Sequence, residues 1–145
     1  MKISIEPLQL SELVSFLRQQ ANDSFPDLKD EQRLNTLAEK WYSSAEFCTC
    51  REEGRLVGMV AFYANGQVSE YAYIPHVYVS PVYRCKGLFK QMLRTVENCI
   101  RLKGYHEIRL EVQKGNVNAL KSYGRTGFVK VGVENSQSVF LKKSV

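Results

Sequence analysis

A short basic loop, residues 81–90, combines residue types and spacing that suit it to chemistry. It follows the apolar run 77–79 and precedes apolar residues at helical spacing, namely Leu88, Met92, Leu93, Val96 and Ile100. The first N–H groups of a helix lack internal partners and carry the positive end of its dipole, and Gly87 lets a ligand approach the backbone closely. This order of strand, loop and helix predicts an anion site, with a phosphate or pyrophosphate as its ligand.

The spacing within this loop separates three classes of nucleotide-binding protein. A Walker loop has four residues between its glycines and then Gly-Lys-Ser/Thr, whereas Gly87 is followed by Leu-Phe-Lys, without a hydroxyl to hold magnesium. A dinucleotide fingerprint has three spaced glycines and an acidic residue about 20 positions later, and this loop has one glycine. The sequence therefore disfavours a P-loop kinase or NTPase and a dinucleotide-binding domain.

The remaining pattern, Arg-x-x-Gly, resembles the GNAT superfamily of acyl-coenzyme A-dependent N-acyltransferases, whose pyrophosphate loop reads Gln/Arg-x-x-Gly-x-Gly/Ala. Arg84, Gly87 and Phe89 occupy the three motif positions. Phe89 departs from the usual glycine or alanine. Its amide can still face a pyrophosphate, but we expect its large ring to turn toward the core.

A second motif lies further along the chain and strengthens the resemblance. The segment Arg109-Leu110-Glu111-Val112 is followed by Asn116, Ala119, Tyr123, Gly127 and Phe128 at the spacing of a later motif of the same superfamily. The resemblance is specific from Val77 to Phe128. Before Val77 it depends on the order of the secondary-structure elements.

The resemblance implies that the protein transfers an acetyl group from acetyl-coenzyme A to a primary amine on a small molecule, amino acid or peptide. The amine would attack the thioester directly, through a tetrahedral intermediate. The alternative is a non-catalytic acyl-coenzyme A sensor or interaction module of the same fold. The resemblance also implies a monomer or a homodimer.

The resemblance assigns cofactor contacts to two segments. Residues Arg84, Cys85, Lys86, Gly87, Leu88, Phe89 and Lys90 would hold the pyrophosphate, and Val77 and Val79 would offer backbone groups to the pantetheine arm. The N–H of Val79 is a candidate oxyanion donor. Asn116 would bind the arm or order its loop, and Ala119 and Tyr123 complete the expected cofactor contacts.

Three side chains are candidates for proton transfer. The resemblance makes Tyr123 the general acid that protonates the leaving thiolate. It favours Glu111 as the general base, because that strand would lie beside the thioester. His76 is an alternative base because its ordinary pKa suits work near neutral pH, and a water relay is a third possibility.

Composition bounds the remaining classes of function. The chain has 145 residues, which suits one domain covering residues 1–145, and a net charge of +5. The local basic excess, at Arg84, Lys86, Lys90 and Arg94, fits an anionic cofactor better than nucleic acid. The four cysteines lack the spacing of a metal site, so no metal is expected. Neither a membrane span nor a signal-peptide core is evident, and we expect a cytoplasmic protein.

Hydrophobic periodicity predicts a mixed α/β (α+β) fold with the order βααβββαβαββ. We expect strands at 2–6, 46–51, 55–64, 106–112, 128–133 and 138–141, and a long strand that follows Asn65-Gly66 and ends at Val79. We expect two helices before residue 46, with apolar stripes at Leu10, Leu13, Val14 and Leu17 and at Leu34, Leu37, Ala38 and Trp41, and later helices at 87–103 and 116–125. Ser11 is a possible N-cap, Asn65-Gly66 a hairpin turn, and Glu134-Asn135 the final turn. Pro75 should interrupt its strand. The sheet should be twisted and mostly antiparallel, with six or seven strands and a splayed central parallel pair.

Overall fold

The computed structural model describes residues 1–66, 70–132, 135 and 137–145. Its strands are β1 (Lys2–Ile5), β2 (Glu46–Glu52), β3 (Arg55–Tyr63), β4 (Ala72–Val79), β5 (Glu107–Gln113), β6 (Val129–Lys130) and β7 (Ser138–Ser144). Its helices are α1 (Leu10–Ala21), α2 (Glu31–Ser44), α3 (Leu88–Leu102) and α4 (Val117–Arg125), with short 3-10 segments η1 (Pro26–Lys29) and η2 (Pro81–Tyr83). The predicted order of elements is confirmed.

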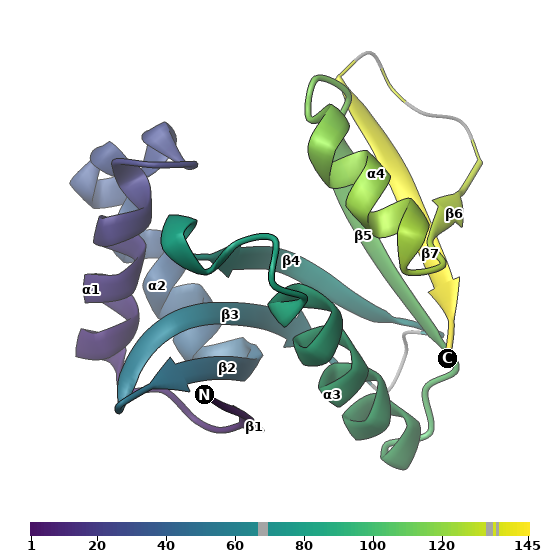
Figure 1. Ribbon diagram of the computed structural model, residues 1–145, viewed down its shortest axis with the longest axis horizontal. Helices are drawn as coiled ribbons and strands as arrows, with labels where there is room; N and C mark the ends of the chain where they lie inside the picture. The colour runs from purple at the N-terminus through teal and green to yellow at the C-terminus, as the bar shows by residue number, and fades with distance from the viewer. Residues whose placement is uncertain (67–69, 133–134, 136) are drawn as a thin grey trace.

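The strands form one seven-stranded sheet in the order β1-β2-β3-β4-β5-β7-β6 (Figure 1). All neighbours are antiparallel except β4 and β5, which run parallel. A parallel pair needs a crossover, and α3 supplies it. The structure thus confirms the predicted mixed, mostly antiparallel sheet with its central parallel pair.

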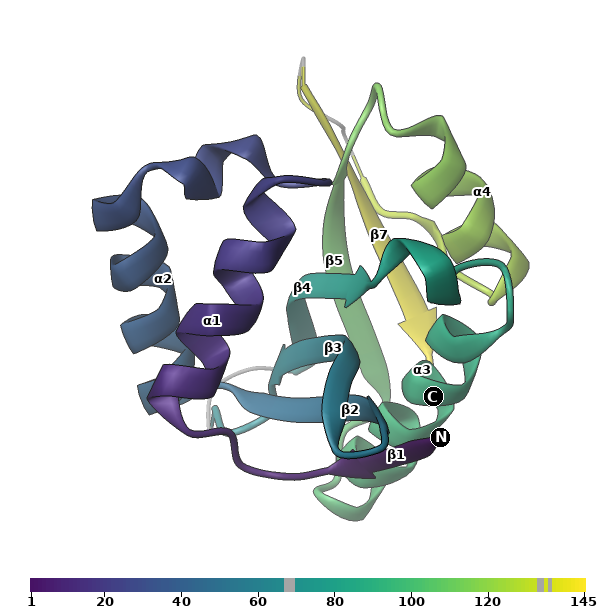
Figure 2. The ribbon, with the colours of Figure 1, turned by 60° about the vertical axis from the view of Figure 1, so that its left-hand side comes forward.

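Helices cover both faces of the sheet, because each helix presents one apolar stripe (Figure 2). The buried residues of α1 and α2, including Leu17, Leu34 and Trp41, pack with Met59 and Tyr78 on one face. On the other face, α3 is fully buried along one stripe and α4 packs beside it, over the apolar side chains of β5 and β7. The two faces are called the α1/α2 face and the α3/α4 face below.

The parallel pair β4 and β5 separates soon after it forms. Within the described strands, their register joins Ala72 to Ile108 and Tyr73 to Arg109, and no later residues pair. The β3–β4 register shifts between Ala61 and Tyr63, opposite Pro75, so the expected interruption at Pro75 is confirmed as a bulge. From there to Val79, the edge of β4 that faces β5 is unpaired, which confirms the predicted splay.

Three local predictions are wrong. Gln9, not Ser11, is the N-cap of α1, because the helix begins at Leu10. The hairpin turn expected at Asn65-Gly66 is wrong, because Tyr63 pairs with Tyr73 and the connection between them is too long for a two-residue turn. The strand expected directly after that turn, β4, begins at Ala72; residues 67–69 lie outside the described part. The strand expected to end at Val133, β6, ends at Lys130. Val133 itself, and Glu134 of the expected final turn, lie outside the described residues.

The described residues contain neither a membrane-spanning helix nor a cluster of metal-binding side chains. None of their helices is long and apolar enough to cross a membrane. No group of three or more His, Cys, Asp or Glu side chains among them is arranged to hold a metal ion. Cys48 and Cys50 are free thiols buried on the same side of β2, as their spacing predicts.

Candidate functional site

The start of α3 is open to an anion. Gly87 is its N-cap in the left-handed region, with φ 79°, and no side chain among the described residues caps it. The first helical hydrogen bond runs from the Gln91 N–H to the Gly87 carbonyl at 3.1 Å. The N–H groups of residues 87–90 therefore lack helical acceptors and carry the positive end of the helix dipole. Lys86 and Lys90 are exposed beside them, whereas the Leu88 side chain is buried in the core.

The loop before α3 contains a second left-handed residue. Cys85 has φ 62°, a conformation that costs a residue with a side chain roughly 1–2 kcal/mol. Its thiol is free and exposed. Strained backbone of this kind is concentrated at ligand sites, where it turns successive N–H groups toward one point.

The unpaired edge of β4 leads to this loop. Ser80 N–H donates to the Val57 carbonyl at 2.8 Å, and Val79 and Val77 stand opposite Gly58 and Val60. In an antiparallel ladder this places Val77 and Val79 at non-hydrogen-bonded pairs, so their N–H and C=O groups point away from β3. Those groups lie on the edge of β4 that β5 leaves unpaired after Tyr73, where the Val79 carbonyl accepts from the Arg84 Nε at 2.8 Å.

The side chain of Arg84 is engaged within the protein. Its guanidinium forms an ion pair with Asp23 and donates to Ser24 Oγ at 3.0 Å. Its backbone N–H donates to the Pro81 carbonyl at 3.2 Å. Arg84 thus differs from Lys86, whose ammonium lies 5.9 Å from the centre of the Tyr83 ring and remains at the exposed loop.

Tyr123 lies beside the start of α3, within an aromatic cluster. Its ring makes edge-to-face contacts with Phe89 at 5.2 Å and with Phe128 at 5.5 Å between centroids. Burial raises the pKa of Tyr123 to about 12. Phe89 packs against the core, as expected, and its contact with Tyr123 joins the start of α3 to α4.

Asn116 and Ala119 form the start of α4. The Asn116 Oδ1 accepts the Ala119 N–H at 3.1 Å, so that the Asn116 side chain caps the helix. This contact orders the loop that precedes α4. Ala119 packs against the same core as Tyr123.

Glu111 lies on β5 with its side chain on the α1/α2 face, because Leu110 and Val112 point into the α3/α4 core. Its side chain is exposed. Burial, and then the nearby charge of Glu111, raise the pKa of Tyr73, whose side chain is on the same face. Glu111 and Tyr123 therefore lie on opposite faces of the sheet.

His76 is buried on the α1/α2 face, between the rings of Phe25 and Trp41 at 4.5 and 4.9 Å. As the Nε2–H tautomer, its imidazole donates to the Gln20 Oε1 at 2.6 Å. Burial lowers the pKa of His76 to about 4. The imidazole is therefore neutral near pH 7.

The structure places Val77, Val79, Phe89, Ala119 and Tyr123 around one core, turns the Arg84 side chain toward Asp23, and divides the proton-transfer candidates. Tyr123, residues 86–90 and the free edge of β4 meet near the α3/α4 face, whereas Glu111 and His76 lie on the other. Sequence reasoning missed Asp23 and Gln20, the partners of Arg84 and His76. Both lie in the mainly polar run of residues 18–24, near the end of α1, where no motif distinguishes them from their neighbours.

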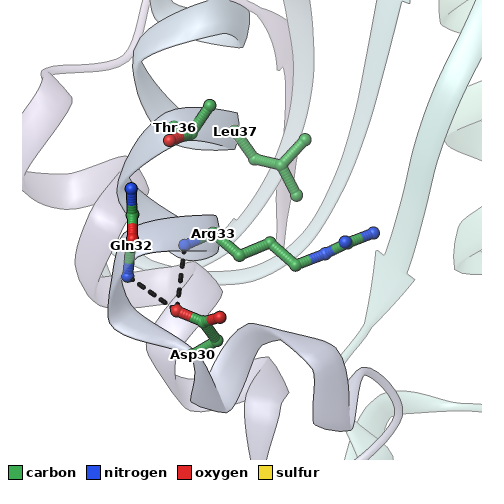
Figure 3. Close-up of a pocket in the computed structure, with 5 residues that line it drawn as sticks. All are labelled: Asp30, Gln32, Arg33, Thr36 and Leu37. Carbon is green, nitrogen blue, oxygen red and sulfur yellow. Dashed lines mark hydrogen bonds between the residues drawn. The ribbon is translucent and has the colours of Figure 1, made fainter.

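A surface hollow of about 390 Å³ lies on α2, lined by Asp30, Gln32, Arg33, Thr36 and Leu37 (Figure 3). Asp30 is the N-cap of α2 and accepts from the N–H groups of Gln32 and Arg33. A second hollow, of about 420 Å³, lies between the end of β3 and the end of α3. All the lining residues of both hollows differ from the predicted site residues.

The comparisons with known proteins agree with this architecture. The model of the GNAT acetyltransferase family matches residues 13–128. No curated protein matches the chain in sequence. Among solved structures, PaiA N-acetyltransferase from Thermoplasma acidophilum, in complex with coenzyme A, is 20% identical over 100% of both chains, with a TM-score of 0.76.

Two further solved structures share the fold. Ard1 from Thermoplasma volcanium is 19% identical, with a TM-score of 0.75 over 100% of this chain and 99% of its own. A GNAT-family acetyltransferase from Staphylococcus aureus Mu50 is 16% identical, with a TM-score of 0.74 over 99% of both chains. At these identities the structures establish the fold, and the family model, which spans most of the chain, establishes the family. The chain belongs to the GNAT family of acetyltransferases.

Proposed function

We propose that the protein transfers an acetyl group from acetyl-coenzyme A to a primary amine. The observation that carries this proposal is the end of β4–β5 pairing after Tyr73 and Arg109, which leaves the edge of β4 unpaired by β5 as far as the loop to the uncapped start of α3. A linear thioester that ends in a pyrophosphate fits such a path. The coenzyme A complex of the PaiA relative supports the same ligand.

The donor would lie on the α3/α4 face. The N–H groups of residues 87–90, with the ammonium groups of Lys86 and Lys90, would hold the pyrophosphate. The outward-facing backbone groups of Val77 and Val79 would bind the amide groups of the pantetheine arm. Tyr123 would then lie at the thioester end of the arm, beside Phe89.

The acceptor amine would approach from the α1/α2 face, where Glu111 lies. An alkyl amine with a pKa near 10 is about 0.1% neutral at pH 7, a cost of roughly 4 kcal/mol. We assign the general base to Glu111, acting directly or through water. His76 is the weaker candidate, because a pKa of about 4 makes its imidazole a poor proton acceptor and because Gln20 and two aromatic rings enclose it.

In the transfer step, the amine nitrogen forms a bond to the thioester carbon while the carbonyl oxygen becomes an oxyanion. The Val79 N–H is the proposed donor to that oxyanion. The C–S bond then breaks, Glu111 takes the proton that the nitrogen loses, and Tyr123 stabilises the departing thiolate. The products are an N-acetyl amine and coenzyme A.

A screen of amines, amino acids and peptides with acetyl-coenzyme A, read by release of free thiol, tests this proposal. We expect at least one acceptor to release thiol in an enzyme-dependent way, and calorimetry to show binding of coenzyme A. Binding without turnover for every acceptor would favour the non-catalytic module instead. No binding at millimolar coenzyme A would contradict both functions.

Substitutions at Cys85 test the conformation of the pyrophosphate loop. We expect Cys85→Gly to bind coenzyme A at least as tightly as the wild type, because glycine adopts a φ of 62° without strain. Cys85→Val should raise the Kd about tenfold, because a β-branched residue is strongly disfavoured there. Isothermal titration calorimetry measures both values, and melting curves exclude global unfolding.

These two variants also separate the backbone of Cys85 from its thiol, since both remove the sulfur. Equal affinities in the Gly and Val variants would show that the left-handed conformation is unimportant. Weak binding by both would assign the contact to the thiol.

A further inference from the structure

Arg84 lies within a hydrogen-bond network that crosses from the cofactor loop to the end of α1. Its Nη2 contacts the Asp23 carboxylate and the Ser24 hydroxyl, while its Nε contacts the Val79 carbonyl. Tyr78 completes the network: its hydroxyl donates to Asp23 Oδ2 at 2.9 Å, and its ring centre lies 5.5 Å from the guanidinium carbon of Arg84. We name these residues, Asp23, Ser24, Tyr78 and Arg84, the loop clamp.

The loop clamp favours the ionised form of the Asp23 carboxylate. Burial opposes ionisation of Asp23, but hydrogen bonds from Ser24, Arg84 and Tyr78 outweigh it and lower its pKa. Asp23 and Arg84 therefore compensate one another within the protein. A guanidinium held in this way has little free charge for a pyrophosphate, which the N–H groups of residues 87–90 and the two exposed lysines can bind without it.

The segment that contains Asp23 and Ser24 continues along the α1/α2 face, from which the acceptor is proposed to approach. The next residue, Phe25, packs its ring on His76 at 4.5 Å and approaches Tyr78 at 6.3 Å, and η1 follows. The Gln19 Nε2 adds a long hydrogen bond to the Ser80 hydroxyl at 3.5 Å. The turn after α1 thus packs on the α1/α2 face of β4. Arg84, which holds this turn, begins the loop that leads to the start of α3 on the other face.

We propose that Arg84 is a positioning residue, which holds the turn at residues 22–26 against β4 as one wall of the acceptor site. The proposal rests on the proposed acetyl transfer. It assigns Arg84 to acceptor binding through Asp23 and Ser24, and not to direct contact with the cofactor phosphates. Side-chain exposures of 40% for Arg84 and 28% for Asp23 mean that the ion pair alone contributes little, so the whole network carries the effect.

Kinetics of Arg84→Gln and Asp23→Asn test this assignment. We expect each variant to raise the acceptor KM about tenfold, the size expected for losing a hydrogen bond to a charged group. The Kd for coenzyme A should stay within about twofold, and the double variant should be no worse than either single one. Arg101→Gln is the matched control, because it removes the same charge and an ion pair, with Glu97, near the opposite end of α3 from the loop.

The alternative role of Arg84 gives the opposite pattern. If its guanidinium binds the pyrophosphate, Arg84→Gln would weaken coenzyme A binding by tenfold or more, and Asp23→Asn would tighten it by freeing the guanidinium. Either result would overturn the proposal, as would an unchanged acceptor KM in both variants.

Hydrogen exchange distinguishes failure of the loop clamp from failure of the proposed function, because it needs no turnover. Amides of residues 22–30 should exchange faster in Arg84→Gln and Asp23→Asn than in the wild type or Arg101→Gln. Unchanged exchange would show that the network does not hold the turn. A wild type that acetylates no acceptor refutes the proposed function and, with it, the acceptor role of the clamp.

Discussion

Tyr123→Phe is expected to lower kcat for acetyl transfer about 10²-fold and to leave the Kd for coenzyme A within about twofold. The phenyl ring keeps both edge-to-face contacts, with Phe89 and Phe128, so cofactor binding and folding should survive. The lost group is the hydroxyl proposed to face the leaving thiolate. General acid–base groups contribute about 10²- to 10⁴-fold.

The environment of Tyr123 places its effect at the lower end of that range. Burial raises the pKa of Tyr123 to about 12, whereas an ordinary thiol has a pKa of about 8.5. Complete proton transfer from the phenol to the thiolate would therefore be uphill by roughly 5 kcal/mol. We infer that Tyr123 acts as a hydrogen-bond donor to the thiolate, with final protonation by water.

Rate measurements at two pH values test this interpretation of Tyr123. Because its pKa of about 12 keeps the phenol protonated, the fold loss in Tyr123→Phe should be the same at pH 7 and pH 9. Tyr42→Phe, which removes a hydroxyl from an exposed residue of α2, should retain wild-type rates. An unchanged kcat in Tyr123→Phe would refute a role of the Tyr123 hydroxyl at the leaving thiolate, either as an acid or as a hydrogen-bond donor.

The sequence was sufficient to predict the elements that build the site. Apolar spacing from Leu88 to Ile100 defines α3, and the position of Gly87 marks its start, because these signals are local. The order of strand, loop and helix then predicts the anion site without tertiary information. Phe89 is the residue for which the structure adds most: its ring joins the loop to Tyr123.

The partners of the site residues could not be predicted, because they depend on tertiary contacts. Arg84 and Asp23 are 61 positions apart, and a basic motif residue gives no sign that its charge is already paired. His76 shows a second obstacle. In a regular strand Ile74 and His76 would share a face, but the bulge at Pro75 puts Ile74 in the α3/α4 core and His76 against α1 and α2.

The candidate residues are divided between the two faces of the sheet, and the proposed transfer would use both. In that proposal the thioester would approach from the α3/α4 face, beside the unpaired edge of β4, and the amine from the α1/α2 face without crossing the cofactor. Glu111 and Tyr123 would then act on different atoms, the nitrogen and the sulfur. This separation suits a direct transfer, in which acceptor and donor are bound together.

His76 is expected to make the protein markedly less stable in mild acid. Its pKa is about 4 in the folded protein, below the ordinary 6.5, because the protonated imidazole cannot be hydrated in its buried site. Below pH 6.5 the unfolded chain therefore binds a proton that the folded protein rejects. The free energy of unfolding should fall by about 2 kcal/mol between pH 7 and pH 5, and by about 3 kcal/mol once the pH is below 4.

Urea denaturation at pH 7, 6 and 5 measures this loss and can assign it to His76. His76→Phe keeps an aromatic ring between Phe25 and Trp41 but leaves Gln20 without its partner, so it should be less stable at pH 7. Its stability should nevertheless change little down to pH 5. His106→Gln, at the exposed second histidine, should retain the wild-type slope.

Between pH 7 and pH 5, the loss of stability caused by His76 can be separated from the loss caused by protonation of carboxylates. Glu6 and Asp23 have lowered pKa values, because hydrogen bonds and ion pairs to Arg51 and Arg84 outweigh the effect of burial. Their stabilising contributions are present above their ordinary pKa values, near 4, and are lost below them. A loss between pH 7 and pH 5 that persists in His76→Phe would therefore contradict the buried, neutral imidazole, and would reopen His76 as an exposed base at the acceptor side.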